Sequence, residues 1–327
     1  MLHKKTWLKI FHTLVLIEII LLLSTKLIAE ISETDLKNIL ASKDLLSKNK
    51  AYIISFIRAN QDRGFDPNQG MVLMNCELTC IPEGLFAMKI IYDYEHPPVY
   101  ARPGTKDYRH TDYDNQGNLI VWKSLEKYIL FTPNRNETLT RIQSFYIDPN
   151  NQILDKGGIQ TIVYRYPTGE RKYTYEFNQF ALSIGYDFSR YVRTINSVKS
   201  LSSGVTRVSS KGSFGKGVNG IWELTIDPNS DFLVRQATLT INGQLEPLIE
   251  VTSSEMVEKD GFKLAKYGTF TYSNLLKIWI KVTGITEVVG KNEIYEEVIS
   301  KLNEPLPTGS EIMDLRDEKP IITNVGN

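Results

Sequence analysis

Three glycines in the segment GKGVNG have the spacing G-x-G-x-x-G, which is found in many nucleotide-binding loops. They are Gly215, Gly217 and Gly220. In a dinucleotide-binding fold this loop follows a strand and opens a helix, whose N-terminus binds the pyrophosphate. Here the following segment, IWELTI, alternates in the manner of a strand, and no kinase or Walker signature accompanies the glycines. We therefore interpret the loop as a turn or bulge between two strands and predict no nucleotide cofactor.

Paired carboxylates in the segment after this loop could act as a general acid and a general base. Glu223 and Asp227 lie on the same side of the predicted strand, and the opposite side is apolar. A solvated outer face explains the pair without catalysis, so we expect Trp222 to be buried and Glu223 exposed. The segment DPNSD then forms the turn to a second strand. The alternation of that second strand shifts near Arg235 and Gln236, which predicts a bulge there.

A histidine with charged neighbours is the next candidate for acid and base chemistry. His110 is flanked by Arg109, Asp112 and Asp114, which could orient or protonate its imidazole. No G-x-S-x-G turn supplies a nucleophile, so we interpret His110 as an exposed strand residue. Asn136 begins the sequence NET, which is a glycosylation acceptor only in a eukaryotic secretory pathway.

The chain has two cysteines, Cys76 and Cys80. Four residues along a strand span roughly 13 Å, which is too far for a disulfide. A bridge could close if Cys80 already lies in the turn that follows, and otherwise the two are small thiols on one face of a strand. They make a poor metal site because only His96 and His110 are available to complete it after the first thirty residues.

Aromatic residues are concentrated in the first series of strand-like segments. Most should be ordinary core and cross-strand pairs. A curled sheet could instead present them on its concave face, around a groove for an acyl chain or another apolar ligand. The candidates for this ligand groove are Tyr92, Tyr94, Tyr113, Trp122, Tyr128 and Phe131.

The first 29 residues have the layout of a secretory signal. Lysines precede an apolar segment over residues 10–23, and Ala29 ends a candidate cleavage site. Glu18 interrupts the apolar segment, and the alternative is an uncleaved membrane anchor. Either interpretation predicts export to a periplasmic or other extracytoplasmic compartment, with membrane contact only through residues 10–29 if the signal is retained.

Composition indicates a folded protein with no bias towards nucleic acid. The 327 residues are 42% hydrophobic and 23% charged, and the formal net charge is zero. A neutral chain has no overall electrostatic attraction for the phosphate backbone, so we predict no nucleic-acid partner.

The elements that must position these residues are mostly strands. After the signal, residues 30–64 have helical spacing, and residues 65–292 form two series of short alternating segments separated by turn residues. A helical insertion near 175–201 divides the two series, and residues 293–327 form a short helix and an extended tail. This order predicts an α+β, mainly β fold, in which a long antiparallel sheet curls into an incomplete barrel with helices packed on its concave side.

The segment FIRANQDRG, the strands after it and the hairpin GIWELTIDPNSDFLVRQATLTI resemble the periplasmic lipoprotein-carrier superfamily. That group contains the outer-membrane lipoprotein carrier and the sigma-E regulatory sensor. The resemblance implies an exported binding protein without catalysis, which holds a lipid, an acyl chain or an envelope protein partner. The alternatives are an exported enzyme acting on envelope lipid or polymer, and a structural or sensory envelope domain.

Overall fold

The computed structural model describes most of the chain beyond the predicted signal. The described residues are 31–62, 72–93, 111–113, 119–133, 137–147, 175–201, 204–214, 218–273, 275–314 and 321–326. The predicted signal and anchor segment, Tyr94, His110 and Asn136 lie outside them.

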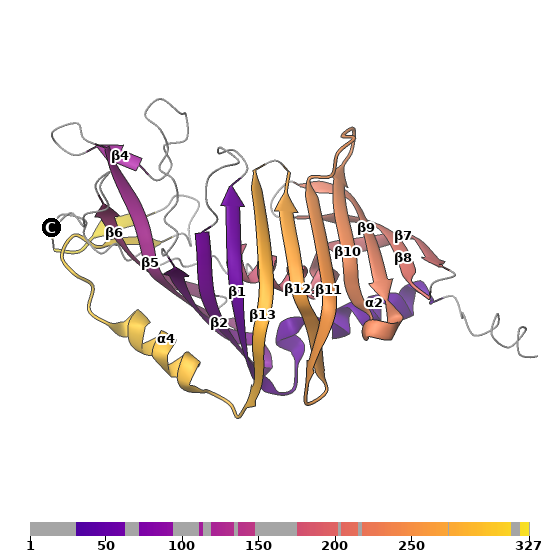
Figure 1. Ribbon diagram of the computed structural model, residues 1–327, viewed down its shortest axis with the longest axis horizontal. Helices are drawn as coiled ribbons and strands as arrows, with labels where there is room; N and C mark the ends of the chain where they lie inside the picture. Colours follow the sequence, from indigo (N-terminus) through magenta and orange to yellow (C-terminus); the bar gives the residue numbers. More distant parts are fainter. Residues whose placement is uncertain are drawn as a thin grey trace, which may run out of the picture.

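One 13-stranded antiparallel sheet forms the body of the protein (Figure 1). Its first strands are β1 (Ala51–Asp62), β2 (Val72–Ile81), β3 (Leu85–Asp93), β4 (Thr111–Tyr113), β5 (Leu119–Thr132) and β6 (Glu137–Ile147). The second series is β7 (Val192–Ser200), β8 (Thr206–Ser213), β9 (Asn219–Asp227), β10 (Leu233–Ile241), β11 (Ile249–Lys259), β12 (Phe262–Tyr272) and β13 (Leu276–Val288). The strand order is β4-β5-β3-β2-β1-β13-β12-β11-β10-β9-β8-β7, and β6 pairs with β5.

The sheet curls strongly but does not close, because β7 pairs with no strand at the other end of the described sheet. Four strand intervals separate β8 from β12, which would be about 19 Å in a flat sheet. Nevertheless the ring of Phe214, just after β8, lies 6.0 Å from that of Phe270 on β12. The predicted fold class, a long antiparallel sheet curled into an incomplete barrel, is therefore confirmed.

Residues 30–64 are not one helical region, which corrects the prediction. The helix α2 (Glu33–Ser42) is capped by Ser32 and is followed by the short 3₁₀ helix η1 (Leu45–Ser47), after which β1 begins. The apolar residues of β1 mimic helical spacing because both of its faces are buried. Phe56 and Ile54 belong to the main core, whereas Ile53 belongs to a second core on the other face.

The helical insertion is also shorter than predicted. Helix α3 covers Tyr175–Ser183, the 3₁₀ helix η4 covers Phe188–Arg190, and the rest of the segment is the edge strand β7. The helix ends where Gly185 adopts a φ of +87°, a left-handed conformation that suits glycine. Residues of β7 were predicted to be helical because they do not alternate strictly between buried and exposed. This pattern is expected of an edge strand at the end of a curled sheet.

The helices do not all pack on the concave side of the sheet. Helices α2 and α3 lie on the concave face, with α2 behind β10–β13 in Figure 1. The short helix predicted near residue 293 is α4 (Glu293–Asn303), and it packs on the opposite face. Its apolar residues Ile294, Tyr295 and Val298 contact the second core, which includes Ala87 of β3 and Leu130 of β5.

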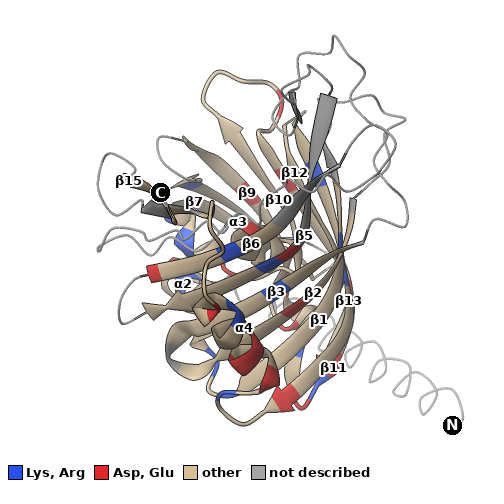
Figure 2. Cartoon of the chain, turned by 90° about the vertical axis from the view of Figure 1, so that its left-hand side faces the viewer, with Lys and Arg blue, Asp and Glu red and all other residues tan. Residues whose placement is uncertain are grey.

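Polar contacts fix α4 at both of its ends. Asn292 caps the helix through its side-chain oxygen and donates to the Thr79 hydroxyl at 2.6 Å. At the other end, the buried Arg141 guanidinium donates to the carbonyl oxygens of Lys301 and Glu304. These bonds satisfy the free groups at the helix ends. Figure 2 shows α4 lying across the strands, and its residues Glu293 and Glu296 are exposed. The tail beyond α4 forms the hairpin of β14 (Glu311–Asp314) and β15 (Ile321–Asn324).

The hairpin of β9 and β10 has the predicted register. Trp222 is fully buried and Glu223 is exposed. The pairing shifts between Val234 and Gln236, which places the bulge at Arg235 as expected. A strand rather than a helix follows the glycine loop, since β9 begins at Asn219 and pairs antiparallel with β8. Gly215 and Gly217 themselves lie outside the described residues.

Candidate functional site

Helix α3 contacts β1 and β3 on the concave face through stacked aromatic rings. The ring of Phe177 lies 4.3 Å from that of Phe86, and the ring of Phe180 lies 4.1 Å from that of Phe56. All four side chains are almost fully buried. Such pairs favour an apolar environment and add to the stability that burial alone provides. We call these residues, with Arg58 and Lys127 beside them, the α3 contact surface.

Arg58 is the polar centre of the α3 contact surface. It is only 5% exposed, and its guanidinium donates to the Gln179 side-chain oxygen at 2.5 Å and to Asn60 at 2.8 Å. The side-chain nitrogen of Gln179 is buried and has no hydrogen-bond acceptor among the described residues. An unsatisfied buried donor costs about 1–3 kcal/mol. The position of α3 against the sheet therefore leaves the side-chain nitrogen of Gln179 without an acceptor among the described residues.

Glu176 and Lys127 form a second polar link between α3 and the sheet. Burial alone would raise the pKa of Glu176, but the charge and hydrogen bond of Lys127, together with the Arg58 charge, lower it to about 2. Glu176 is therefore ionised at any physiological pH. Because it is already paired and charged, it is unsuited to donate a proton in catalysis.

The C-terminal end of α3 is held differently, by backbone contacts with β12 and β10. The amide of Ala265 donates to the Ile184 carbonyl at 3.4 Å, and the amide of Val234 donates to the Gly185 carbonyl at 3.4 Å. Gly268 makes this approach possible, since a Cβ atom there would lie 2.1 Å from the Ser183 carbonyl oxygen. Hence α3 is anchored by its backbone at one end and by side chains at the other.

A charged cluster follows the anchored end of α3. The carboxylate of Asp187 accepts from the Leu45 amide at 2.7 Å, and Arg190 forms a double hydrogen bond with Asp44. Burial raises the pKa of Asp187 to about 6, although the Arg190 charge opposes the shift, and the nearby Asp44 adds to it. This cluster ties η4 to the segment between α2 and η1.

The two cysteines are free and buried, so the disulfide alternative is not found. Strand β2 continues through Cys80 to Ile81, which keeps the two residues four positions apart on one strand. Burial raises the pKa of the Cys76 thiol to about 12, and it raises that of Cys80 as well. Thiols that stay protonated at neutral pH are poor nucleophiles and poor metal ligands.

The residues predicted to line one ligand groove are divided between the two faces. Phe131 belongs to the main core, and Tyr92 packs against it, so both are on the concave side. Tyr128 lies in the second core beneath α4, and its hydroxyl donates to Glu126 at 2.7 Å. Tyr113 and Trp122 are in β4 and β5. The predicted groove is wrong for Tyr128, because alternate residues of β5 point to opposite faces.

Asp227, the second member of the predicted carboxylate pair, has a structural role. Its side chain accepts hydrogen bonds from the Asn229 amide and the Ser230 hydroxyl, and it pairs with Arg235. It therefore shapes the turn between β9 and β10. Among the described residues, no group of three or more His, Cys, Asp or Glu side chains could hold a metal ion.

Comparison with known proteins gives matches only among solved structures. No family model and no curated protein matches the chain. A DUF1329 family protein from Desulfovibrio piger aligns with 79% of this chain and 94% of its own, at 9% identity and a TM-score of 0.43. An outer membrane lipoprotein-sorting protein domain from Vibrio parahaemolyticus aligns over 80% and 97%, at 11% identity and a TM-score of 0.42.

A LolA superfamily protein from Nitrosomonas europaea aligns with 76% of this chain and 92% of its own, at 8% identity and a TM-score of 0.38. Because the scores and identities are low, the functional proposal below depends on the site itself. In the part of the chain that the structure describes, no helix is long and apolar enough to cross a bilayer.

Sequence reasoning did not single out Arg58, Gln179 or Gly268 as site residues. One signal was present, since Arg58 interrupts the apolar run AYIISFIRAN. A charged residue within a strand that is buried on both faces requires a partner.

Proposed function

We propose that this protein is an exported binding protein that holds a lipid or acyl chain between the concave face of its sheet and α3, without catalysis. In this proposal residues 1–29 direct export, as a cleaved signal or as an anchor, and the sheet with its helices is the binding unit. An acyl chain would take the place now filled by Phe177 and Phe180.

The observation that carries the proposal is the difference between the two ends of α3. The C-terminal end is fixed to β12 and β10 by backbone contacts, whereas the N-terminal end depends on Arg58 and Lys127. Side-chain links of this kind can be exchanged for water, since a hydrogen bond to a charged group contributes only about 1.5–3 kcal/mol net. The N-terminal half can therefore move while the other end stays attached.

The chemistry beneath α3 suits an apolar ligand. Phe56 and Phe86 present their rings to the helix, and Cys76 and Met88 lie in the same core. A ligand that displaced Phe177 and Phe180 would bury similar apolar area, which compensates for the loss of the two aromatic stacks. The Arg58 guanidinium, released from Gln179, would then be available to a carboxylate or ester oxygen of the ligand.

Titration with a dansyl-labelled fatty acid tests the proposal. Arg58→Met keeps the aliphatic stem but removes the hydrogen bond to Gln179. If α3 must move away from the sheet for binding, this variant spends more time with α3 displaced. It should then bind the neutral methyl ester of the labelled fatty acid at least about 10-fold more tightly than the wild type does. The control is Lys50→Met, which removes an exposed ion pair with Glu287 and should leave the affinity unchanged.

Two outcomes contradict the proposal. One is the absence of saturable probe binding to the wild-type chain and to Arg58→Met. The other is the same gain in affinity for Arg58→Met and Lys50→Met. Urea denaturation of each variant establishes that it remains folded during the titration.

A further inference from the structure

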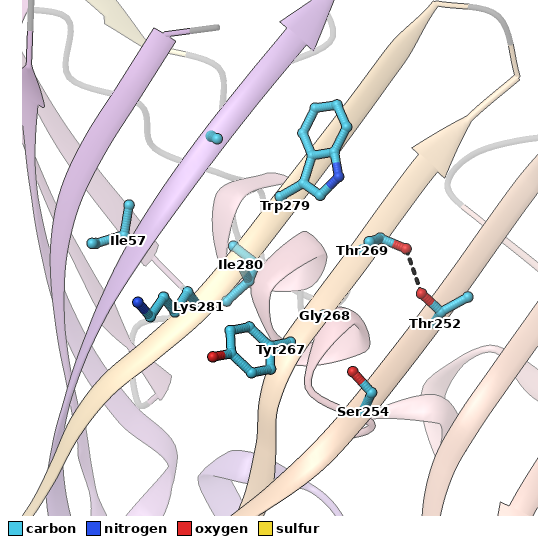
Figure 3. Close-up of a pocket in the computed structure, with 10 residues that line it drawn as sticks. Ile57, Thr252, Ser254, Tyr267, Gly268, Thr269, Trp279, Ile280 and Lys281 are labelled. Atoms are coloured by element: carbon cyan, nitrogen blue, oxygen red, sulfur yellow. Dashed lines mark hydrogen bonds between the residues drawn. The ribbon is translucent and has the colours of Figure 1, made fainter.

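A hollow of about 280 Å³ lies on the convex face of the sheet, on the side away from α3 (Figure 3). It is bounded by two cross-strand rows contributed by β1, β13, β12 and β11. The first row is Ile57, Lys281, Tyr267 and Ser254, and the second is Ala59, Trp279, Thr269 and Thr252. These residues alternate with core residues such as Ile278 and Ile280, which places their side chains on the outer face.

The hollow lies where the sheet divides. The pairing of β12 with β13 ends at Tyr267 and Lys281. Beyond this point β13 continues beside β1 as far as Val288, and β12 continues beside β11 as far as Phe262. Large side chains therefore lie next to small ones where the pairing of β12 with β13 ends, and the space between them is left open.

Both aromatic side chains at the hollow are held in place by a lysine. The Lys277 ammonium lies 4.9 Å from the centre of the Trp279 ring, and the Lys266 ammonium lies 5.1 Å from that of Tyr267. Lys277 and Lys281 flank Trp279 along the same face of β13. One side of the indole is therefore covered by Lys277, and Trp279 is one of the residues that line the hollow.

The polar groups around the hollow are mostly hydroxyls. In Figure 3 the Thr252, Thr269 and Ser254 hydroxyls lie on the β11 side, while the Tyr267 hydroxyl and the Lys281 amine point towards β1. Thr252 and Thr269 are hydrogen-bonded to each other at 2.6 Å. No carboxylate lines the hollow, and Lys281 forms no ion pair with any described residue.

We propose that this hollow binds an acidic sugar, a carboxylated pyranose ring of a glycan, stacked on Trp279. The face of a pyranose carries C–H groups that fit the electron-rich face of an indole. Its hydroxyl groups both donate and accept, as do the hydroxyls of Ser254, Thr252 and Tyr267. The unpaired Lys281 favours a carboxylate on the sugar.

The size of the hollow agrees with this ligand class. It can hold one sugar ring, whereas drug-sized ligands occupy clefts of about 300–1,000 Å³. The site lies on the opposite face from α3 and does not depend on the proposed acyl-chain binding.

Isothermal titration with trigalacturonate and with neutral cellotriose tests the inference. Wild-type protein should bind trigalacturonate saturably, and Trp279→Ala should weaken binding at least 10-fold. Lys281→Ala should lower the affinity for trigalacturonate to that for cellotriose. Thr225→Ala on β9, which is on the same face but outside the hollow, should change neither affinity.

Tyr267→Phe provides a milder test, because it keeps the ring and removes only the hydroxyl. It should weaken trigalacturonate binding by several-fold while urea denaturation remains unchanged. The inference is wrong if neither sugar binds, or if Trp279→Ala and Thr225→Ala bind trigalacturonate equally well. It is also wrong if the site binds anionic phospholipid vesicles but neither sugar, since this would identify a lipid headgroup as the ligand.

Discussion

Gly268 is the position at which the attachment of α3 to the sheet can be tested most directly. A Cβ atom at this residue would lie 2.1 Å from the Ser183 carbonyl oxygen, 2.6 Å from its carbonyl carbon and 2.9 Å from its Cβ. All three atoms belong to the last residue of α3, and two are backbone atoms. A side chain cannot rotate away to relieve this contact, so Gly268→Ala must displace the helix or β12 by about 1 Å.

The cost should be that of overpacking a well-packed core, about 1–3 kcal/mol in the free energy of unfolding. Phe180 lies one turn before Ser183, so the displacement should also loosen its stack with Phe56. We therefore expect Gly268→Ala to unfold at lower urea concentration and to bind a dansyl-labelled fatty acid more tightly than the wild type.

Gly284 on the neighbouring strand β13 is the matched control. A Cβ atom there meets only the Ser55 side chain, at 3.8 Å, which is an ordinary contact. Gly284→Ala should leave stability unchanged or raise it by up to about 1 kcal/mol, since alanine restricts the unfolded chain. If the two variants have the same unfolding midpoint, α3 does not approach β12 as described, and the anchored end of the helix is wrongly placed.

Two further predictions concern the charged cluster and the hairpin. The pKa of Asp187 is raised to about 6, above that of an unfolded aspartate near 4. The folded state therefore binds a proton more readily than the unfolded state, and the free energy of unfolding should rise as the pH falls from about 7 to about 4. Asp187→Asn should flatten this change, which is up to about 3 kcal/mol, and an equal pH dependence in both proteins by urea denaturation would refute the assignment. Trp222→Ala should cost about 3–5 kcal/mol and Glu223→Ala less than about 0.5 kcal/mol; a larger loss for Glu223→Ala would contradict the register of β9.

The sheet could be predicted from the sequence where one face of a strand is solvated. In β9 the alternation of Trp222 with Glu223 identified the buried face, and in β10 the phase shift near Arg235 identified the bulge. The alternation is informative there because the outer face of β9 is not covered by a helix. Local sequence then reports the environment of each residue directly.

The prediction failed where both faces of a strand are covered. In β1, Phe56 packs against α3 and Ile53 against the core beneath α4, so apolar residues occur without alternation. The resulting spacing resembles that of a helix, and the sequence offers no local feature that separates the two. The strand β5 is likewise covered on both faces, and Tyr128 lies on the face beneath α4 and not in the predicted groove.

The central contact of the candidate site shows why its residues could be suspected but not paired. Arg58 lies within the apolar run of β1, where a charge is tolerated only with a partner. That partner, Gln179, is 121 residues away on α3, and its approach depends on the curl of the sheet and on the missing side chain at Gly268. The residues close to Arg58 in the sequence indicate neither the curl of the sheet nor the role of Gly268. A buried charge in a strand therefore indicates that a functional or structural contact exists, whereas the identity of the contact follows only from the fold.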